Sequence, residues 1–131
     1  MAVHASVRLA PVPESAARAR DFVAATMRAW ECAEVIDDAR VVVTELVSNV
    51  VRHVGTDVSI DLDLVDECLR VAVCDRGNGH VVLGTPDHRS EAGRGLRLVD
   101  RLTDRWGVEQ QPGEKCVWAE WRVAGRPALH A

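Results

Sequence analysis

The sequence predicts an α/β fold in which helices cover one face of a mixed, mostly antiparallel sheet. Short segments that alternate apolar and polar residues, typical of half-buried strands, occur near both ends of the chain and in its middle. Longer segments with apolar residues at helical spacing lie between them. The expected order is β-α-α-β-β-loop-α-β-β. It favours a two-layer α/β sandwich, because the helices must bury their apolar sides against the sheet.

The first half of the chain is predicted to contain one strand and two helices. Residues 3–10 alternate in polarity and form the strand, which a Pro-Val-Pro segment ends. A helix is expected from Glu14 to about Ala29, where alanine and arginine are frequent. Residues 35–53 are rich in valine but form a run too long for a strand, so we expect a second helix there, closed by Gly55.

The second half is predicted to contain two hairpins with a helix between them. Residues 57–65 and 68–75 alternate in polarity around an Asp-Glu turn, which indicates an antiparallel hairpin with one covered face. A polar, glycine-rich loop should span residues 76–93. A helix follows over residues 94–106. Two last strands, residues 106–111 and 115–124, surround a Pro-Gly-Glu turn.

Length and composition indicate one globular domain. Of 131 residues, 47% are hydrophobic and 27% charged, and we expect a domain over residues 1–124 with a frayed tail over 125–131. The net charge of −4 provides no basic surface, so no direct contact with nucleic acid is expected. No apolar run approaches the roughly 20 residues of a membrane helix. The N-terminus also lacks a secretory signal pattern, so no membrane contact and a cytoplasmic location are expected.

Four cysteines, Cys32, Cys68, Cys74 and Cys116, include no CxxC or other close pair. A disulfide framework or a zinc site therefore has little support. We expect reduced cysteines that act as small core residues.

The predicted second helix carries polar residues inside the most apolar run of the chain, VVVTELVSNVVRHV. Glu45 and Asn49 are four residues apart and should share a helix face, with Arg52 and His53 close to it. A carboxylate can act as a general base, and an amide oxygen suits Mg²⁺. Taken alone, however, the pair is better explained as the solvated stripe of an amphipathic helix.

A second polar motif, DRGNG, begins at the end of the first hairpin. Asp75 has the parity of the strand's apolar residues, so its carboxylate should face the covered side and need a donor, such as the exocyclic amine of a ligand. Gly77 and Gly79 would let a ring approach the backbone. An ordinary turn opened by an aspartate explains the motif equally well. A calcium loop is excluded, because Pro86 stands where its glutamate ligand belongs.

The third motif, GRGLRLV, is predicted at the start of the last helix. Free N–H groups at a helix N-terminus, beside glycines, suit a phosphate chain. The motif is not a dinucleotide fingerprint, because Leu98 stands where the third glycine would be, and no P-loop GK[ST] follows. Together the three motifs supply a base and metal ligand, an acceptor for an amine and a phosphate-binding helix start.

The segments TELVSNVVRH, VCDRGNG and GRGLRLVDRLTDRWG resemble the N, G1 and G2 boxes of GHKL ATPases, which have the Bergerat ATP-binding fold. The resemblance covers nearly the whole chain and is strongest with single-domain anti-sigma-factor serine/threonine kinases of the actinobacterial type. It implies that Glu45 is the base or water-positioning residue and that Asn49 binds Mg²⁺. Asp75 would accept from the adenine amino group, and Gly77 and Gly79 would wall the adenine pocket.

The same resemblance implies a lid over the bound ATP, formed by residues 85–93. Gly93 and Gly95 would bind the phosphates. The other residues that it places at the nucleotide are Arg52, Arg94, Leu96 and Cys116, the last where family members often have threonine.

The function that this resemblance implies is phosphorylation of a protein antagonist (an anti-anti-sigma factor) with Mg·ATP, coupled to sequestration of a sigma factor. A homodimer is one assembly that it allows. The alternative is a GHKL-like module that holds a protein partner without catalysis. Glu45 with Asn49 favours the kinase, whereas Cys116 and Glu91 favour the binding module. A sensor histidine kinase fragment is disfavoured, since no phosphoacceptor helix pair precedes the domain.

Overall fold

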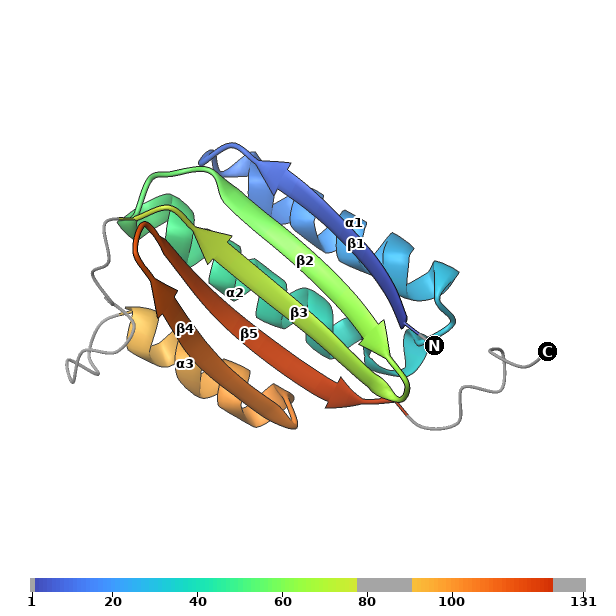
Figure 1. Ribbon diagram of the computed structural model, residues 1–131. Helices are drawn as coiled ribbons and strands as arrows, with labels where there is room; N and C mark the ends of the chain where they lie inside the picture. The colour runs from blue at the N-terminus through green and yellow to red at the C-terminus, as the bar shows by residue number, and fades with distance from the viewer. Residues whose placement is uncertain (1, 78–90, 124–131) are drawn as a thin grey trace.

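The computed structural model describes residues 2–77 and 91–123 and has two layers, one sheet and one set of helices (Figure 1). The sheet contains β1 (Ala2–Leu9), β2 (Val58–Val65), β3 (Cys68–Asp75), β4 (Arg105–Gln111) and β5 (Glu114–Arg122). The helices are α1 (Glu14–Ala29), the short 3₁₀ helix η1 (Ala33–Val35), α2 (Ile36–His53) and α3 (Glu91–Leu102). The predicted α/β two-layer fold is confirmed, with α1, α2 and α3 on the same face of the sheet (Figure 1).

The strand order is β1-β2-β3-β5-β4. Every pairing described is antiparallel, so the sheet expected to be mixed has no parallel pair among the described strands. The order places β5 beside β3, although α3 and β4 separate them in the sequence. The last residue of β3, Asp75, consequently pairs with Lys115 at the start of β5.

Helix α2 forms despite its many valines, because their spacing gives it one continuous apolar side. Val42, Val43, Leu46 and Val47 are almost completely buried, as expected for an amphipathic helix between a sheet and a neighbouring helix. Gly55 ends the helix as predicted. It adopts a φ of +76°, and its N–H donates to the carbonyl of Val50 at 2.8 Å.

The alternating residues of the strands meet these helices. The residues Val58, Ile60, Leu62, Leu69 and Val71 are fully buried, whereas their chain neighbours on the other face are only partly so. Each such side chain removes apolar surface from water, worth roughly 1.5–3 kcal/mol. The period of two therefore decides which face of the sheet the helices cover.

None of the described helices lies on the opposite face of the sheet (Figure 1), which is largely polar. Its Trp118 ring lies 4.4 Å from the guanidinium carbon of Arg70 and covers Gly107, where an added Cβ would approach the ring to 2.7 Å. Arg70 also pairs with Glu120 at 3.3 Å. A cation-π contact and ion pairs thus shield this tryptophan in place of a second helical layer.

The boundaries near α3 differ from the prediction. The helix begins at Glu91 instead of residue 94 and ends at Leu102, so Trp106 belongs to β4 alone. The chain leaves the helix because Asp104 already donates its N–H to the carbonyl of Glu120 across the sheet, at 3.0 Å. The predicted tail and residues 85–90 of the predicted lid lie outside the described residues.

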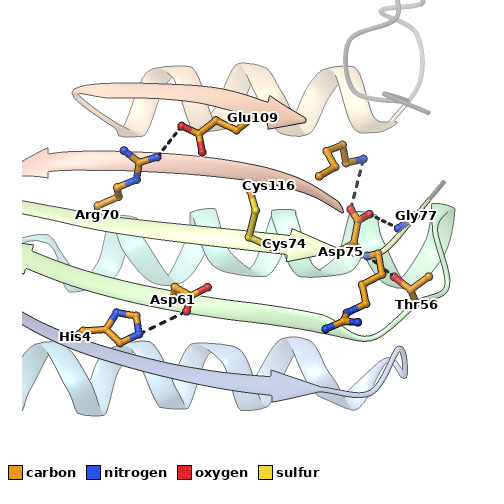
Figure 2. The surroundings of a disulfide bond; sticks show 11 residues. His4, Thr56, Asp61, Arg70, Cys74, Asp75, Gly77, Glu109 and Cys116 are labelled. Carbon is orange, nitrogen blue, oxygen red and sulfur yellow. Dashed lines mark hydrogen bonds and ion pairs between the residues drawn. A yellow bond between two sulfur atoms is a disulfide. The ribbon is translucent and has the colours of Figure 1, made fainter. Parts of the chain in front are cut away.

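The expectation of four reduced cysteines is wrong for one pair. Cys74 and Cys116 form a disulfide on the face of the sheet away from the helices (Figure 2). The register of β3 and β5 places them directly opposite each other, with their Cα atoms 4.0 Å apart, although 42 positions separate them in the chain. Cys32 and Cys68 are thiols. No helix in the described part of the chain is long and apolar enough to cross a membrane.

Candidate functional site

A pocket lies where the C-terminal half of α2 faces the end of β3 and the start of β5. Its lining combines apolar residues with four that carry polar side chains, and consists of Leu46, Asn49, Val50, His53, Val54, Val73, Asp75, Lys115 and Val117. The free volume inside is about 10 Å³, the space of roughly one water molecule. Three elements that are distant in the sequence thus place an amide, a carboxylate and an ammonium group in one apolar setting.

Asp75 lies on the covered face, as its parity predicted, and is 2% exposed. Its Oδ1 accepts from the N–H of Gly77 at 2.9 Å (Figure 2). Its Oδ2 lies 3.5 Å from the Nζ of Lys115. The next residue, Arg76, donates its N–H to Thr56 Oγ1 at 3.0 Å. The buried carboxylate therefore has partners for both oxygens. The backbone that follows β3 is fixed by the hydrogen bonds of the Arg76 and Gly77 N–H groups.

Asn49 points into the same pocket and is 4% exposed. Among the residues that the structure describes, neither its Oδ1 nor its Nδ2 has a hydrogen-bond partner. A buried polar group without a partner costs about 1–3 kcal/mol, and α2 could bury a leucine here instead. The amide is thus poised to bind something that enters the pocket, and its oxygen has the chemistry of a Mg²⁺ ligand.

Gly77 lies where the backbone passes close to its neighbours. A Cβ added there would be 2.9 Å from Val54 Cγ1 and 3.0 Å from the Asp75 Oδ1 that its own N–H binds. Any side chain would push the carboxylate or the helix end aside, so a glycine is needed for the pocket as it stands. Gly79 lies outside the described residues.

Glu45 and Arg52 do not line the pocket of Asn49. They share a neighbouring groove of about 470 Å³ with Pro13 and Ala16, and Glu45 also lines a second groove of about 390 Å³ toward Arg20. Four residues turn a helix by about 400°, so Glu45 lies roughly 40° around the axis from Asn49. The structure thus brings Asn49 together with Asp75, and Glu45 together with Arg52.

The glycines of the third motif lie inside α3. The helix begins at Glu91, which places Gly93 and Arg94 in its first turn and Gly95 just beyond it. Free N–H groups belong to the first turn of a helix, so Gly93 is better placed than Gly95 for a phosphate. Leu96 packs against the core.

Cys116 does not face the pocket. Its parity on β5 is that of Trp118 and Glu120, on the open face, and its sulfur is bonded to Cys74. The residue of β5 that faces Asp75 is Lys115, 4% exposed and missed by the sequence reasoning. Two signals could have found it. Lys115 is the single lysine of the chain, and it shares parity with the apolar residues of its strand.

Comparison with known proteins gives a consistent result. A family model described as a histidine kinase-like ATPase domain matches residues 9–121. An uncharacterized protein of Streptomyces coelicolor is 32% identical over 98 residues, which cover 66% of this chain and 85% of that protein. The matched segment of the family model extends from the end of β1 through β5 and contains every element of the pocket.

Solved structures share the fold at lower identity. The structure of the RsbU and RsbW domains of Rv1364c from Mycobacterium tuberculosis matches 92% of this chain with a TM-score of 0.69 and 17% identity. This chain spans about a third of the length of that one, 32%. The histidine kinase AdeS of Acinetobacter baumannii matches with a TM-score of 0.56, 9% identity and coverage of 92% and 68% of the two chains. A blue-light activated histidine kinase domain from Erythrobacter litoralis EL346 has a TM-score of 0.53 and 20% identity, over 74% of this chain and 48% of that one.

Proposed function

We propose that this chain, which belongs to the histidine kinase-like ATPase domain family, binds Mg·ATP and phosphorylates a serine or threonine of a protein antagonist. In this proposal the chain acts as an anti-sigma factor in the cytoplasm and holds a sigma factor when the antagonist is phosphorylated. The family membership supports ATP as the nucleotide. The fold shared with the structure of RsbU and RsbW domains supports a protein partner.

The observation that carries the proposal is the buried polar pair in the pocket. Asp75 Oδ2 has room for a further hydrogen bond beside Lys115, because a carboxylate offers about four lone-pair sites and two are engaged. The amino group of adenine is a donor that would use it. Asn49 supplies, in the same pocket, an amide that has no hydrogen-bond partner in residues 2–77 and 91–123. Burying a carboxylate and an unpartnered amide lowers the free energy of unfolding, so fold stability alone does not account for these two residues.

The residues present fit a Mg²⁺ ion carried in by the nucleotide. Mg²⁺ prefers oxygen ligands and is usually held by few protein groups together with phosphate oxygens. Asn49 Oδ1 is the group of the described residues that would hold it. When bound, the ion would neutralise negative charge that develops on the phosphates during transfer.

Glu45 is the proposed base or water-positioning residue. It lies one turn before Asn49 on α2, in grooves that are open to a second molecule. From there its carboxylate would accept the proton of an incoming hydroxyl group. Arg52, in the same groove, would stabilise negative charge of the phosphates.

The test is transfer of radiolabelled γ-phosphate to a protein captured from the native host by this chain, with and without ATP. Labelling of serine or threonine on that protein is expected. Tight capture with no transfer would contradict the kinase and leave the second candidate, a binding module. That candidate is favoured by the separation of Glu45 from the Asn49 pocket.

A further inference from the structure

Lys115 has more hydrogen-bonding capacity than the described residues use. Its side chain is 5% exposed at the junction of β3 and β5, and its Nζ lies 3.5 Å from Asp75 Oδ2. An ammonium group carries three donors. In residues 2–77 and 91–123 this ion pair is the one polar contact of the Lys115 side chain. At least one N–H of a buried cation is therefore left for another group in the pocket.

Stability alone does not explain this arrangement. A buried ion pair contributes little net stability unless further hydrogen bonds satisfy both groups, and an apolar pair of similar volume is often as stable. Of the 16 lysine and arginine residues of the chain, all but Lys115 are arginine. A compact ammonium fits here where a planar guanidinium would need more space.

We propose that Asp75 and Lys115 act as an acceptor and donor pair that reads the base of the nucleotide, which deepens the proposed ATP-binding function and rests on it. Asp75 Oδ2 accepts from the exocyclic amino group of adenine. Lys115 Nζ donates to one of the two ring nitrogens that flank that amino group. The two protein atoms are adjacent, and adenine presents a donor beside an acceptor in the same way.

The pair also disfavours guanine in the same position. Guanine carries a keto oxygen where adenine carries its amino group, so an acceptor would face the Asp75 carboxylate. A buried polar group left unpaired on the protein then lowers affinity, as in sites that reject analogues lacking a hydrogen-bonding group. Lys115 is thus proposed to determine specificity, without contact to the reacting phosphates.

The narrow pocket must open for a base to enter, and the lining indicates where. His53 is exposed, whereas Lys115 and Asp75 are buried. If the His53 side chain turns outward, the ion pair of Asp75 and Lys115 stays intact. Withdrawing Lys115 into solvent would leave Asp75 without its cation in an apolar setting. We therefore expect Lys115 to stay beside Asp75 when the base is bound.

The experiment is calorimetry of wild type, Lys115→Met and Lys115→Arg with ATP, 1-deaza-ATP, 7-deaza-ATP and GTP. The deaza analogues each replace one ring nitrogen by carbon. Wild type should bind one of them about tenfold more weakly than ATP, as expected for loss of a hydrogen bond to a charged group, and GTP more weakly as well. Lys115→Met should bind ATP about tenfold more weakly and bind ATP and that analogue equally. Lys115→Arg should keep part of the difference in affinity between ATP and that analogue.

The matched control is Arg122→Met, which removes a cation of the same strand that is 80% exposed and should leave every affinity unchanged. If wild type binds ATP and both deaza analogues equally, the proposed contact of Lys115 with a ring nitrogen is refuted, while the proposed ATP binding stands. Tighter ATP binding by Lys115→Met would also refute that contact, by showing that Lys115 blocks the pocket. Wild type that binds no nucleotide would refute the proposed function itself. If Lys115→Met does not fold, the affinities of wild type for ATP and for the two deaza analogues still test the proposal.

Discussion

Two adjacent residues on β3 and two on β5 form two pairs with opposite chemistry. On the covered face, Asp75 and Lys115 form an ion pair that lines a pocket. On the open face, one residue away on each strand, Cys74 and Cys116 form a disulfide (Figure 2). Because side chains alternate along a strand, one position along each strand separates a pair that lines the pocket from a pair that is covalently bonded. Changes on the covered face should therefore alter binding, and changes on the open face should alter stability alone.

The largest effect is expected at Glu45, which belongs to neither pair. Glu45→Ala should reduce γ-phosphate transfer to the captured partner by about 10²–10⁴-fold, the usual contribution of a general base. ATP affinity should change little, since Glu45 does not line the Asn49 pocket. The matched control is Glu31→Ala, at the turn after α1, a residue that lines neither groove. Unchanged transfer in Glu45→Ala would exclude Glu45 as the base.

Breaking the open-face pair should destabilise the fold without affecting the pocket. A variant with Cys74→Ser and Cys116→Ser should lose about 2–4 kcal/mol in the free energy of unfolding, because the disulfide closes a long loop in the unfolded chain. Denaturant titrations with and without reductant would measure the loss. ATP affinity should stay within about twofold at temperatures where the variant is folded. A larger change in affinity would show that the two faces are coupled.

Removing the amide of Asn49 should change nucleotide binding and leave stability nearly unchanged, the reverse of removing the disulfide. Asn49→Ala should abolish the dependence of ATP affinity on Mg²⁺, as calorimetry with Mg²⁺ and with EDTA would show. Its stability should fall little, because the removed groups have no hydrogen-bond partner in the part of the chain that the structure describes. Wild type that binds ATP equally well in EDTA would refute the metal role of Asn49.

The smallest effect is expected on the open face at Asp61. Burial raises the pKa of its carboxyl above the ordinary value of 3.8, Asp63 and Glu114 raise it further, and His4 opposes them. The folded state then binds the proton more tightly than the unfolded state, so this group makes the protein less stable as pH rises through 3.8 toward the raised pKa. Asp61→Asn should remove this decline and gain less than about 1 kcal/mol above that range. Unfolding of both proteins would be followed between pH 3 and 7. A decline in the variant that is equal to or steeper than that of wild type would contradict this assignment.

The strands, the helices and the direction of Asp75 could be predicted because they depend on local periodicity. The alternation of residues 68–75 fixes which side each residue faces, and the 19 positions from 35 to 53 are too many for a strand. The family resemblance could be recognised for a similar reason, since its three motifs are contiguous segments.

The disulfide and the contact of Lys115 with Asp75 could not be predicted, because both depend on how β5 pairs with β3. The parity of Lys115 places it on the covered face but does not say which residue of β3 it meets. That pairing crosses a helix and a strand, and a shift by one residue would exchange Cys116 for Lys115 in the pocket. Sequence spacing carries no information on such a register. The separation of Glu45 from Asn49 was missed for another reason. Four residues overshoot a full helical turn by about 40°, and Glu45 lines the grooves beside the pocket of Asn49 instead of that pocket itself.

The most direct test of the central claim, that the pocket of Asp75 and Asn49 binds ATP, is calorimetry of Mg·ATP with wild type and Asp75→Asn. The substitution keeps the size of the side chain and an oxygen for the Gly77 N–H, but removes the charge that Lys115 pairs with and one acceptor for the adenine amine. Melting curves of both proteins would establish the temperatures at which each is folded. We expect ATP binding by the variant to weaken by about 1–3 kcal/mol, roughly 5- to 150-fold. Equal affinity in the two folded proteins would contradict the claim.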